Sequence, residues 1–77
     1  MTLDELGANQ RAIICDIHLK EMDRQRLFHL GVYIGAIISL QAKAPLQDPI
    51  IYFVCGSAIV LRRQEAKAIM ITLEDSI

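Results

Sequence analysis

The chain lacks most of the features that reveal a function directly. It contains no Trp, only two Phe and two Tyr, and only two Cys in 77 residues. Neither G-x-x-x-x-G-K-[ST] nor G-x-G-x-x-G is present, which argues against nucleotide binding by this chain. No apolar run approaches the roughly 20 residues that a membrane-spanning helix needs, so direct membrane insertion is not expected. Two His and two Cys without a clear orienting arrangement give no basis for nucleophilic catalysis, and we expect no enzyme.

The charge balance argues against a second class of function. Lys and Arg total 8 and Asp and Glu total 9, which gives a formal net charge of −1 at pH 7. A nucleic-acid-binding domain needs a basic surface to neutralise phosphates. Arg62, Arg63 and Lys67 form a small basic cluster, but neighbouring acids offset it and aromatic side chains are sparse. We therefore expect no nucleic acid partner.

The cysteines and the N-terminal residues bear on the cellular location. Cys15 and Cys55 are too far apart for a zinc-binding spacing and too few for a disulfide framework. In a reducing compartment both are expected to be free thiols. Residues 1–5 are acidic and lack the charged and apolar regions of a signal peptide, so the cytoplasm is the expected location.

Aliphatic side chains are what the chain has in excess. Hydrophobic residues make up 53% of the sequence, compared with about 45–50% in soluble domains. The length predicts a single domain over residues 1–77, close to the lower limit for folding without covalent or metal cross-links. So small a domain cannot bury this much apolar surface, and we expect part of it to face a partner.

Hydrophobic periodicity predicts five short strands and one helix. The strands are expected at residues 10–17, 36–44, 50–54, 58–61 and 69–73, and the helix at 20–30. A capping box at residues 2–5 predicts one helical turn, and strong helix formers at 62–68 predict another before the last strand. Short strands with tight turns favour a small five-stranded barrel, which would also remove exposed sheet edges.

The same periodicity assigns side chains to the core. Two glycines, Gly31 and Gly35, are expected to turn the chain from the helix into the second strand. The expected core-facing sets are Ile13, Cys15 and Ile17 in the first strand; Met22, Leu27 and Leu30 in the helix; Ile38, Leu40 and Ala42 in the second strand; Ile59 and Leu61 in the fourth; and Ile69, Ile71 and Leu73 in the last.

Three ordered motifs resemble the FeoA family. The family pattern runs Leu-Gly-x-x-x-Gly, then Pro-Leu-Gly-Asp-Pro-Ile, then Leu-Arg-x-x-Glu-Ala. The chain has Leu30-Gly31 with Gly35, then residues 45–50 (Pro-Leu-Gln-Asp-Pro-Ile), then residues 61–66 (Leu-Arg-Arg-Gln-Glu-Ala). It departs from the pattern at Ile34, where a Pro is common, at Gln47, where the family has Gly, and at Cys55, where an Arg is common.

The resemblance implies both a fold and a role. It implies a mainly β, SH3-like barrel and a non-enzymatic accessory role in bacterial ferrous iron uptake. The implied partner is the cytoplasmic part of FeoB, a membrane permease that carries a GTP-binding domain. The alternatives are a metal-responsive regulatory module and a direct iron carrier, and a homo-oligomer is the alternative to a foreign partner.

Five residues are candidates for a partner-binding surface. The family register places Ile50, Tyr52 and Val54 inside the barrel, so Ile51 and Phe53 point outward, together with Val60 on the paired strand. Tyr33 and Ile34 add apolar bulk at the glycine corner. A run of five apolar residues does not fix its own register, so a reversed register or coverage by other segments is the competing interpretation.

A metal site is the other candidate, and it is the weaker one. Cys15, His18 and Glu21 are spaced by three, and Asp23 follows. Zinc or iron needs three or four convergent ligands with further support, and this stretch offers one Cys, one His and ordinary acids. Cys15 is also expected in the core. We therefore predict no bound metal and no cofactor, and assign His29 to the last turn of the helix.

Overall fold

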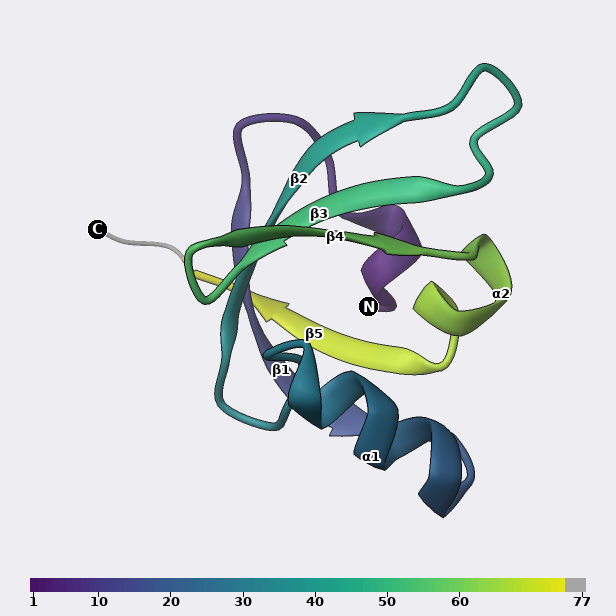
Figure 1. The fold of residues 1–77 in the computed structure, drawn as a ribbon. Helices are drawn as coiled ribbons and strands as arrows, with labels where there is room; N and C mark the ends of the chain where they lie inside the picture. Colours follow the sequence, from purple (N-terminus) through teal and green to yellow (C-terminus); the bar gives the residue numbers. More distant parts are fainter. Residues whose placement is uncertain (75–77) are drawn as a thin grey trace.

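A computed structural model describes residues 1–74 as a small curled sheet with short helices at its margins (Figure 1). In chain order the elements are the 3-10 turn η1 (Leu3–Glu5), β1 (Arg11–Ile17), α1 (Glu21–His29), β2 (Ile37–Lys43), β3 (Ile50–Val54), β4 (Ser57–Leu61), α2 (Arg63–Ala66) and β5 (Ile69–Leu73). The predicted five strands, the helix between the first two and the helical turn before the last are confirmed, with every boundary within two residues of the prediction. The residues from 75 onward lie outside the described part.

All neighbouring strands pair antiparallel in one sheet of order β4-β3-β2-β1-β5. The predicted closure of the barrel is wrong, because within residues 1–74 no ladder joins β4 to β5. Both therefore remain edge strands. The N-terminal segment lies along β5 instead, where Thr2 forms a bridge with Met70 and the amide of Ile71 donates to the carbonyl of Met1.

The concave face of the sheet holds the core. Leu3 and Leu6, from the N-terminal turn and the residue after it, are fully buried there. The buried phenol of Tyr52 donates to the carbonyl oxygen of Leu3 at 3.0 Å and so attaches η1 to β3. The strands contribute the following buried side chains: Ala12, Ile14, Ile17, Ile38, Ile50, Val54, Ile59, Leu61, Ile69 and Ile71.

The predicted core face of the first strand is wrong for Ile13 and Cys15. Ile17 is buried as predicted, but Ile14 is buried in place of Ile13, and both Ile13 and Cys15 are exposed. The cause is a β-bulge: Ile14 pairs with Ile71 and Asp16 with Met70, so Cys15 is an extra residue without a partner on β5. An extra residue shifts the side-chain alternation by one, which a strict period of two cannot anticipate.

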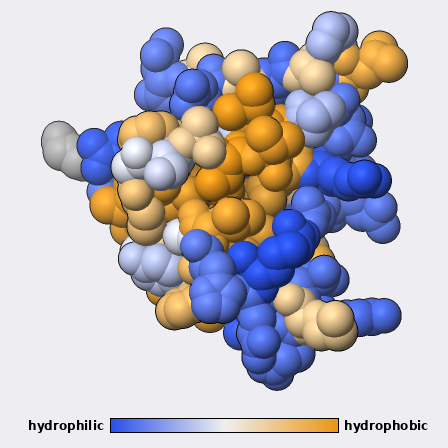
Figure 2. Space-filling view, viewed as in Figure 1, coloured by the Kyte–Doolittle hydropathy of each residue, from blue (hydrophilic) through white to orange (hydrophobic). Residues whose placement is uncertain are grey.

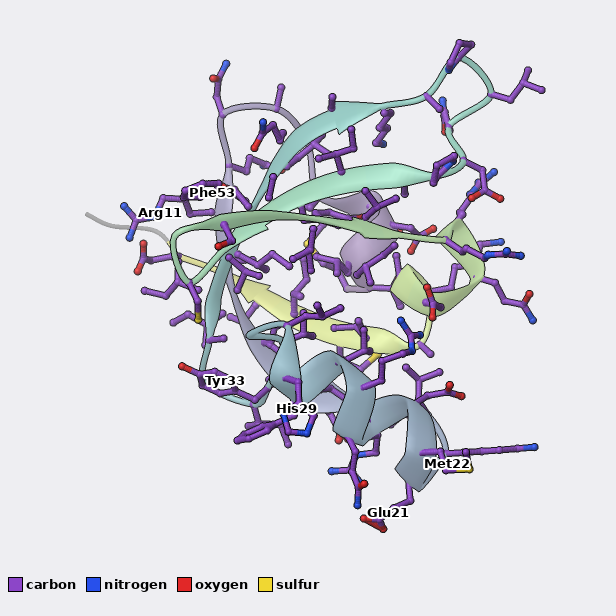
Figure 3. The ribbon with its side chains drawn as sticks, in the orientation of Figure 1. Arg11, Glu21, Met22, His29, Tyr33 and Phe53 are labelled. Atoms are coloured by element: carbon purple, nitrogen blue, oxygen red, sulfur yellow. The ribbon has the colours of Figure 1, made fainter. Side chains whose placement is uncertain are left out.

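The predicted buried stripe of the helix is wrong at two of its three positions. Leu27 is buried, but Met22 is 83% exposed and Leu30 is also exposed. The helix packs on the sheet only near its C-terminal end, where Leu27 accepts the amide of the buried Val32. Its N-terminal half extends away from the sheet, and Met22 lies at the outer end of α1 in Figure 3. The spacing of apolar residues therefore predicts which face of a helix is apolar, but not how much of that face the sheet covers.

Two other core assignments fail at strand ends. In β2, Ile38 is buried and Leu40 half-buried, but Ala42 is exposed beyond an irregularity between Leu40 and Ala42. In β5, Ile69 and Ile71 are buried as predicted, whereas Leu73 is exposed near the end of the strand. The core is thus narrower than the alternating pattern suggests.

Candidate functional site: an exposed apolar surface

The outer face of β3 and β4 carries three of the predicted contact residues. Ile50, Tyr52 and Val54 are buried, which settles the register in the predicted sense. On the opposite face Phe53 is 45% and Val60 is 58% exposed, and Ile51 is half-buried. Ile51 and Val60 are directly paired across the two strands, so their side chains are neighbours on this face.

The apolar face continues across β2 and β1. Ile37 and Ile13 are a directly opposed pair, and both are exposed. Phe53 faces Ser39, two residues along β2 from Ile37. A shallow depression of about 350 Å³ beside Phe53 is lined by Arg11, Ile37, Ser39, Phe53, Val54 and Cys55. Sequence reasoning missed Ile13, because its orientation depends on the bulge at Cys15. It also missed Ile37, although the alternation of β2 with Ile38 in the core places Ile37 on the outer face.

The corner between α1 and β2 carries the other two predicted residues. Gly31 and Gly35 have φ of +96° and +98°, as the corner requires. Between them Tyr33 is 40% and Ile34 is 54% exposed. The corner is fixed to β1, since the amide of Gly35 donates to the carbonyl of Ile14 at 2.7 Å.

An aromatic pair on α1 and the corner borders a groove. The rings of Phe28 and Tyr33 are 5.8 Å apart between centroids, within the range of favourable aromatic contacts. The groove has a volume of about 300 Å³, and its walls combine apolar and charged side chains. They are Ile17, Glu21, Arg24, Gln25, Phe28, His29, Val32, Tyr33 and Ile34.

Cys55, at the tip of the β3–β4 hairpin, connects the groove with the outer face of the sheet. Its Sγ lies 3.5 Å from the carbonyl oxygen of Gly31 and 3.7 Å from the hydroxyl oxygen of Tyr33. The hydrogen bond that the Cys55 thiol donates to this hydroxyl raises the pKa of Tyr33. Tyr33 and Phe53 both project toward the left of Figure 3. The structure thus places the five predicted residues in two adjoining apolar areas, here called the corner (Tyr33, Ile34) and the sheet face (Ile51, Phe53, Val60).

Apolar side chains also gather at the centre of the face shown in Figure 2, over β4 and surrounded by hydrophilic side chains. Burying apolar area contributes roughly 25 cal/mol per Å², and contiguous exposed apolar patches commonly mark interaction sites. The arrangement can therefore bind another apolar surface, whereas the residues in it offer no covalent chemistry.

The structure does not bring the four candidate metal ligands together. Within residues 1–74 no three His, Cys, Asp or Glu side chains gather where they could hold a metal ion. His18 instead contacts Asp16, with 2.8 Å between Nε2 and Oδ2. This hydrogen bond, and a second from the amide of Ile17, lower the pKa of the Asp16 carboxyl. Cys15 is exposed on the bulge, with its Sγ 3.8 Å from the hydroxyl oxygen of Thr72.

Carboxylates accept backbone hydrogen bonds at the start of α2, where the basic cluster lies. The amide of Arg63 donates to Asp48 in the loop at residues 44–49. The amide of Arg62 donates to Glu65, whose carboxylate also pairs with Arg26 from α1. Acidic groups thus lie among these cations, as the sequence suggested. None of the helices in the described part is long and apolar enough to cross a membrane.

A curled sheet of five antiparallel strands with a helical turn before the last, and an exposed apolar surface, defines a small SH3-like domain. The chain belongs to the FeoA family, because the FeoA domain model matches residues 1–73. A curated relative from Porphyromonas gingivalis, a fusion of Fe(2+) transport protein A with the Fe(2+) transporter FeoB, is 32% identical over 76 residues. That match covers 99% of this chain but only 9% of the relative, so the chain spans about a tenth of its length.

Solved structures of FeoA proteins have the same fold. FeoA from Chlorobium tepidum is 37% identical with a TM-score of 0.87, over 92% of this chain and 68% of that one. FeoA from Stenotrophomonas maltophilia, solved in complex with zinc and described as a prokaryotic SH3 domain protein, is 30% identical with a TM-score of 0.75. The latter match covers 94% of this chain and 89% of that one. The predicted family and the SH3-like fold class are thereby confirmed.

Proposed function

We propose that this chain is a non-enzymatic accessory protein of ferrous iron uptake that acts in the cytoplasm by contact with a FeoB-like permease. The observation that carries the proposal is the pair of adjoining apolar areas, the corner and the sheet face, left exposed on so small a domain. The relative that joins a FeoA and a FeoB part in one chain supports the choice of partner. The description of the Stenotrophomonas protein as a candidate activating factor of ferrous iron transport supports the process.

The contact we propose is the docking of the corner and the sheet face against the cytoplasmic part of the permease. Phe53, Val60 and Ile34 are each about half exposed, so each has apolar area left to bury. Fully burying one large apolar side chain contributes roughly 1.5–3 kcal/mol, and half-exposed ones contribute about half of that. Interfaces of this kind depend on a few apolar and aromatic residues, for which Phe53 and Tyr33 are the candidates here. The GTPase or transport cycle of the permease is what such a contact would modulate.

Calorimetric titration of the chain into the purified cytoplasmic part of the permease tests this proposal. Phe53→Glu and Tyr33→Glu are each expected to weaken binding about tenfold or more, since a carboxylate cannot be desolvated cheaply. Leu46→Glu is the matched control, because Leu46 is 87% exposed and lies in the loop at the other end of β3. Binding that is lost in Leu46→Glu but kept in Phe53→Glu would refute the proposed surface.

A titration of Fe²⁺ into the chain alone separates the proposal from the iron-carrier and metal-responsive alternatives. The proposed role requires no stoichiometric iron binding by this chain. Tight binding that disappears in Cys15→Ser would favour the alternatives instead.

A further inference from the structure

β4 has one edge that pairs with β3 and one that is free. Its two-residue turn at Cys55 and Gly56 makes Val54 and Ser57 a hydrogen-bonded pair, and such pairs then alternate along the ladder. The backbone groups of Ser57, Ile59 and Leu61 therefore point toward β3. Those of Ala58 and Val60 point away from it, and within residues 1–74 no other backbone group bonds to them.

The free edge of β4 lacks the features with which proteins usually protect edge strands. The strand Ser57–Leu61 contains no charged residue, no proline and no bulge. Ala58 and Val60 are both exposed. The opposite edge of the sheet differs, because Met1 and Thr2 occupy part of β5. The edge of β4 is therefore better suited than the edge of β5 to pair with an extended strand.

We infer that the free edge of β4 pairs antiparallel with β4 of a second copy of this chain, around a two-fold axis at Ile59. In that register Ala58 of each copy opposes Val60 of the other, and both residues direct their amide and carbonyl groups across the interface. Each such pair exchanges two backbone hydrogen bonds, about four in all, and the two sheets become continuous.

The sequence of β4 is compatible with pairing to itself, which favours a second copy of this chain as the partner of its free edge. Residues on the two strands that oppose each other in a two-fold pairing come from the same sequence, so like charges on β4 would repel. β4 has none, and Arg62 and Arg63 lie beyond its end, opposite the hairpin turn of the other copy. On the outer face Ala58 and Val60 meet their counterparts and extend the apolar row formed by Val60 and Ile51. Such a dimer forms from this chain alone, without a permease.

A five-residue strand pairing buries little area, so the dimer is expected to be weak, with a Kd on the order of 0.1 mM. The test is a dilution series of the ¹⁵N-labelled chain by NMR, from about 1 mM downward. The amides of Ala58 and Val60 are expected to shift and lose exchange protection on dilution. Mixed ¹³C-labelled and unlabelled chains are expected to show an intermolecular contact between the two Ile59 Hα atoms, which face each other in a non-hydrogen-bonded pair.

Two variants separate pairing at the edge from association through the sheet face. Ala58→Pro removes a donor that β3 does not use, so it is expected to keep the fold and to abolish the dimer. Phe53→Glu, on the sheet face and one strand inward from the edge, leaves the backbone groups of Ala58 and Val60 free to pair, so it is expected to leave the dimer intact. If thermal unfolding shows that Ala58→Pro is unfolded, Val60→Lys tests the same edge by placing a charge on it.

A chain that stays monomeric up to about 1 mM overturns the inference, as does a dimer lost in Phe53→Glu but kept in the edge variants. Because these measurements use the chain alone, their failure leaves the proposed permease contact untouched. Loss of permease binding in the calorimetric test likewise leaves the dimer untouched, so the two hypotheses fail separately.

Discussion

Gly31 lies directly against the side chain of Cys55. A Cβ atom added to Gly31 would be 3.0 Å from the Cβ and 3.2 Å from the Sγ of Cys55. The two residues are far apart in sequence. Their contact packs the corner after α1 against the tip of the β3–β4 hairpin. It thereby holds the two parts of the proposed binding surface in one position relative to each other.

Replacing Gly31 by Ala is therefore expected to lower the free energy of unfolding by roughly 2–5 kcal/mol. About 1–2 kcal/mol comes from the left-handed backbone and the rest from overpacking against Cys55. Gly35→Ala is the matched control, since Gly35 has a similar positive φ but nothing within 4 Å of an added Cβ. Gly35→Ala is expected to lower the free energy of unfolding only by the roughly 1–2 kcal/mol that the left-handed backbone costs. Urea denaturation of the two variants measures the difference.

The double variant Gly31→Ala with Cys55→Gly tests the cause. It removes the Cβ and Sγ that the new methyl group would strike, and Cys55 itself has a positive φ of 51° that Gly adopts without strain. The steric part of the loss is expected to be recovered. Equal losses in Gly31→Ala and Gly35→Ala, or no recovery in the double variant, would show that the contact does not matter.

Tyr52→Phe is expected to destabilise the fold by about 0.5–1.5 kcal/mol, because the buried carbonyl of Leu3 loses one of its two donors and keeps only the amide of Leu6. Burial, with a contribution from Asp4, raises the pKa of Tyr52, so its phenol remains a neutral donor. Tyr33→Phe serves as the control, since its hydroxyl is at the surface, and is expected to change stability by less than about 0.5 kcal/mol. Chemical denaturation followed by circular dichroism compares the two, and similar losses in both would argue against the role given to Tyr52.

The Asp16 carboxyl is expected to titrate below its ordinary value of 3.8, chiefly because His18 donates a hydrogen bond to it. Since the pKa is lower in the folded chain than in the unfolded one, the associated stability is present above about pH 4. It disappears as the pH falls through the folded value. NMR titration of the carboxyl carbon measures the midpoint. His18→Ala is expected to raise it and His29→Ala to leave it unchanged; an unmoved midpoint in His18→Ala would contradict this assignment.

The sequence predicted the parts of the structure in which local rules act alone. The alternation of β3 with its buried Tyr52 and outward Phe53 followed from the family register, and Gly31 and Gly35 were recognisable from their spacing. The loop between β2 and β3 coincides with the second family motif, at residues 45–50. There Gln47 has a φ of 63°, which gives a physical reason for the Gly that the family pattern has at that position.

What could not be predicted depends on contacts between distant residues. The bulge at Cys15 is decided by how β1 pairs with β5, and it alone determines that Ile13 rather than Ile14 is exposed. The contact of Cys55 with Tyr33 joins residues from a hairpin and a corner, and no spacing in the sequence records it. The exposure of Met22 likewise reflects how little of α1 the small sheet can cover.

The central claim is that the corner and the sheet face are where this chain meets a FeoB-like permease. The most direct test is to add the unlabelled cytoplasmic part of the permease to the ¹⁵N-labelled chain and to map the amide signals that change. We expect the largest changes at Tyr33, Ile34, Phe53 and Val60, with the loop around Leu46 unaffected. Changes concentrated at the loop or at the exposed N-terminal half of α1, with the corner and the sheet face silent, would contradict the account.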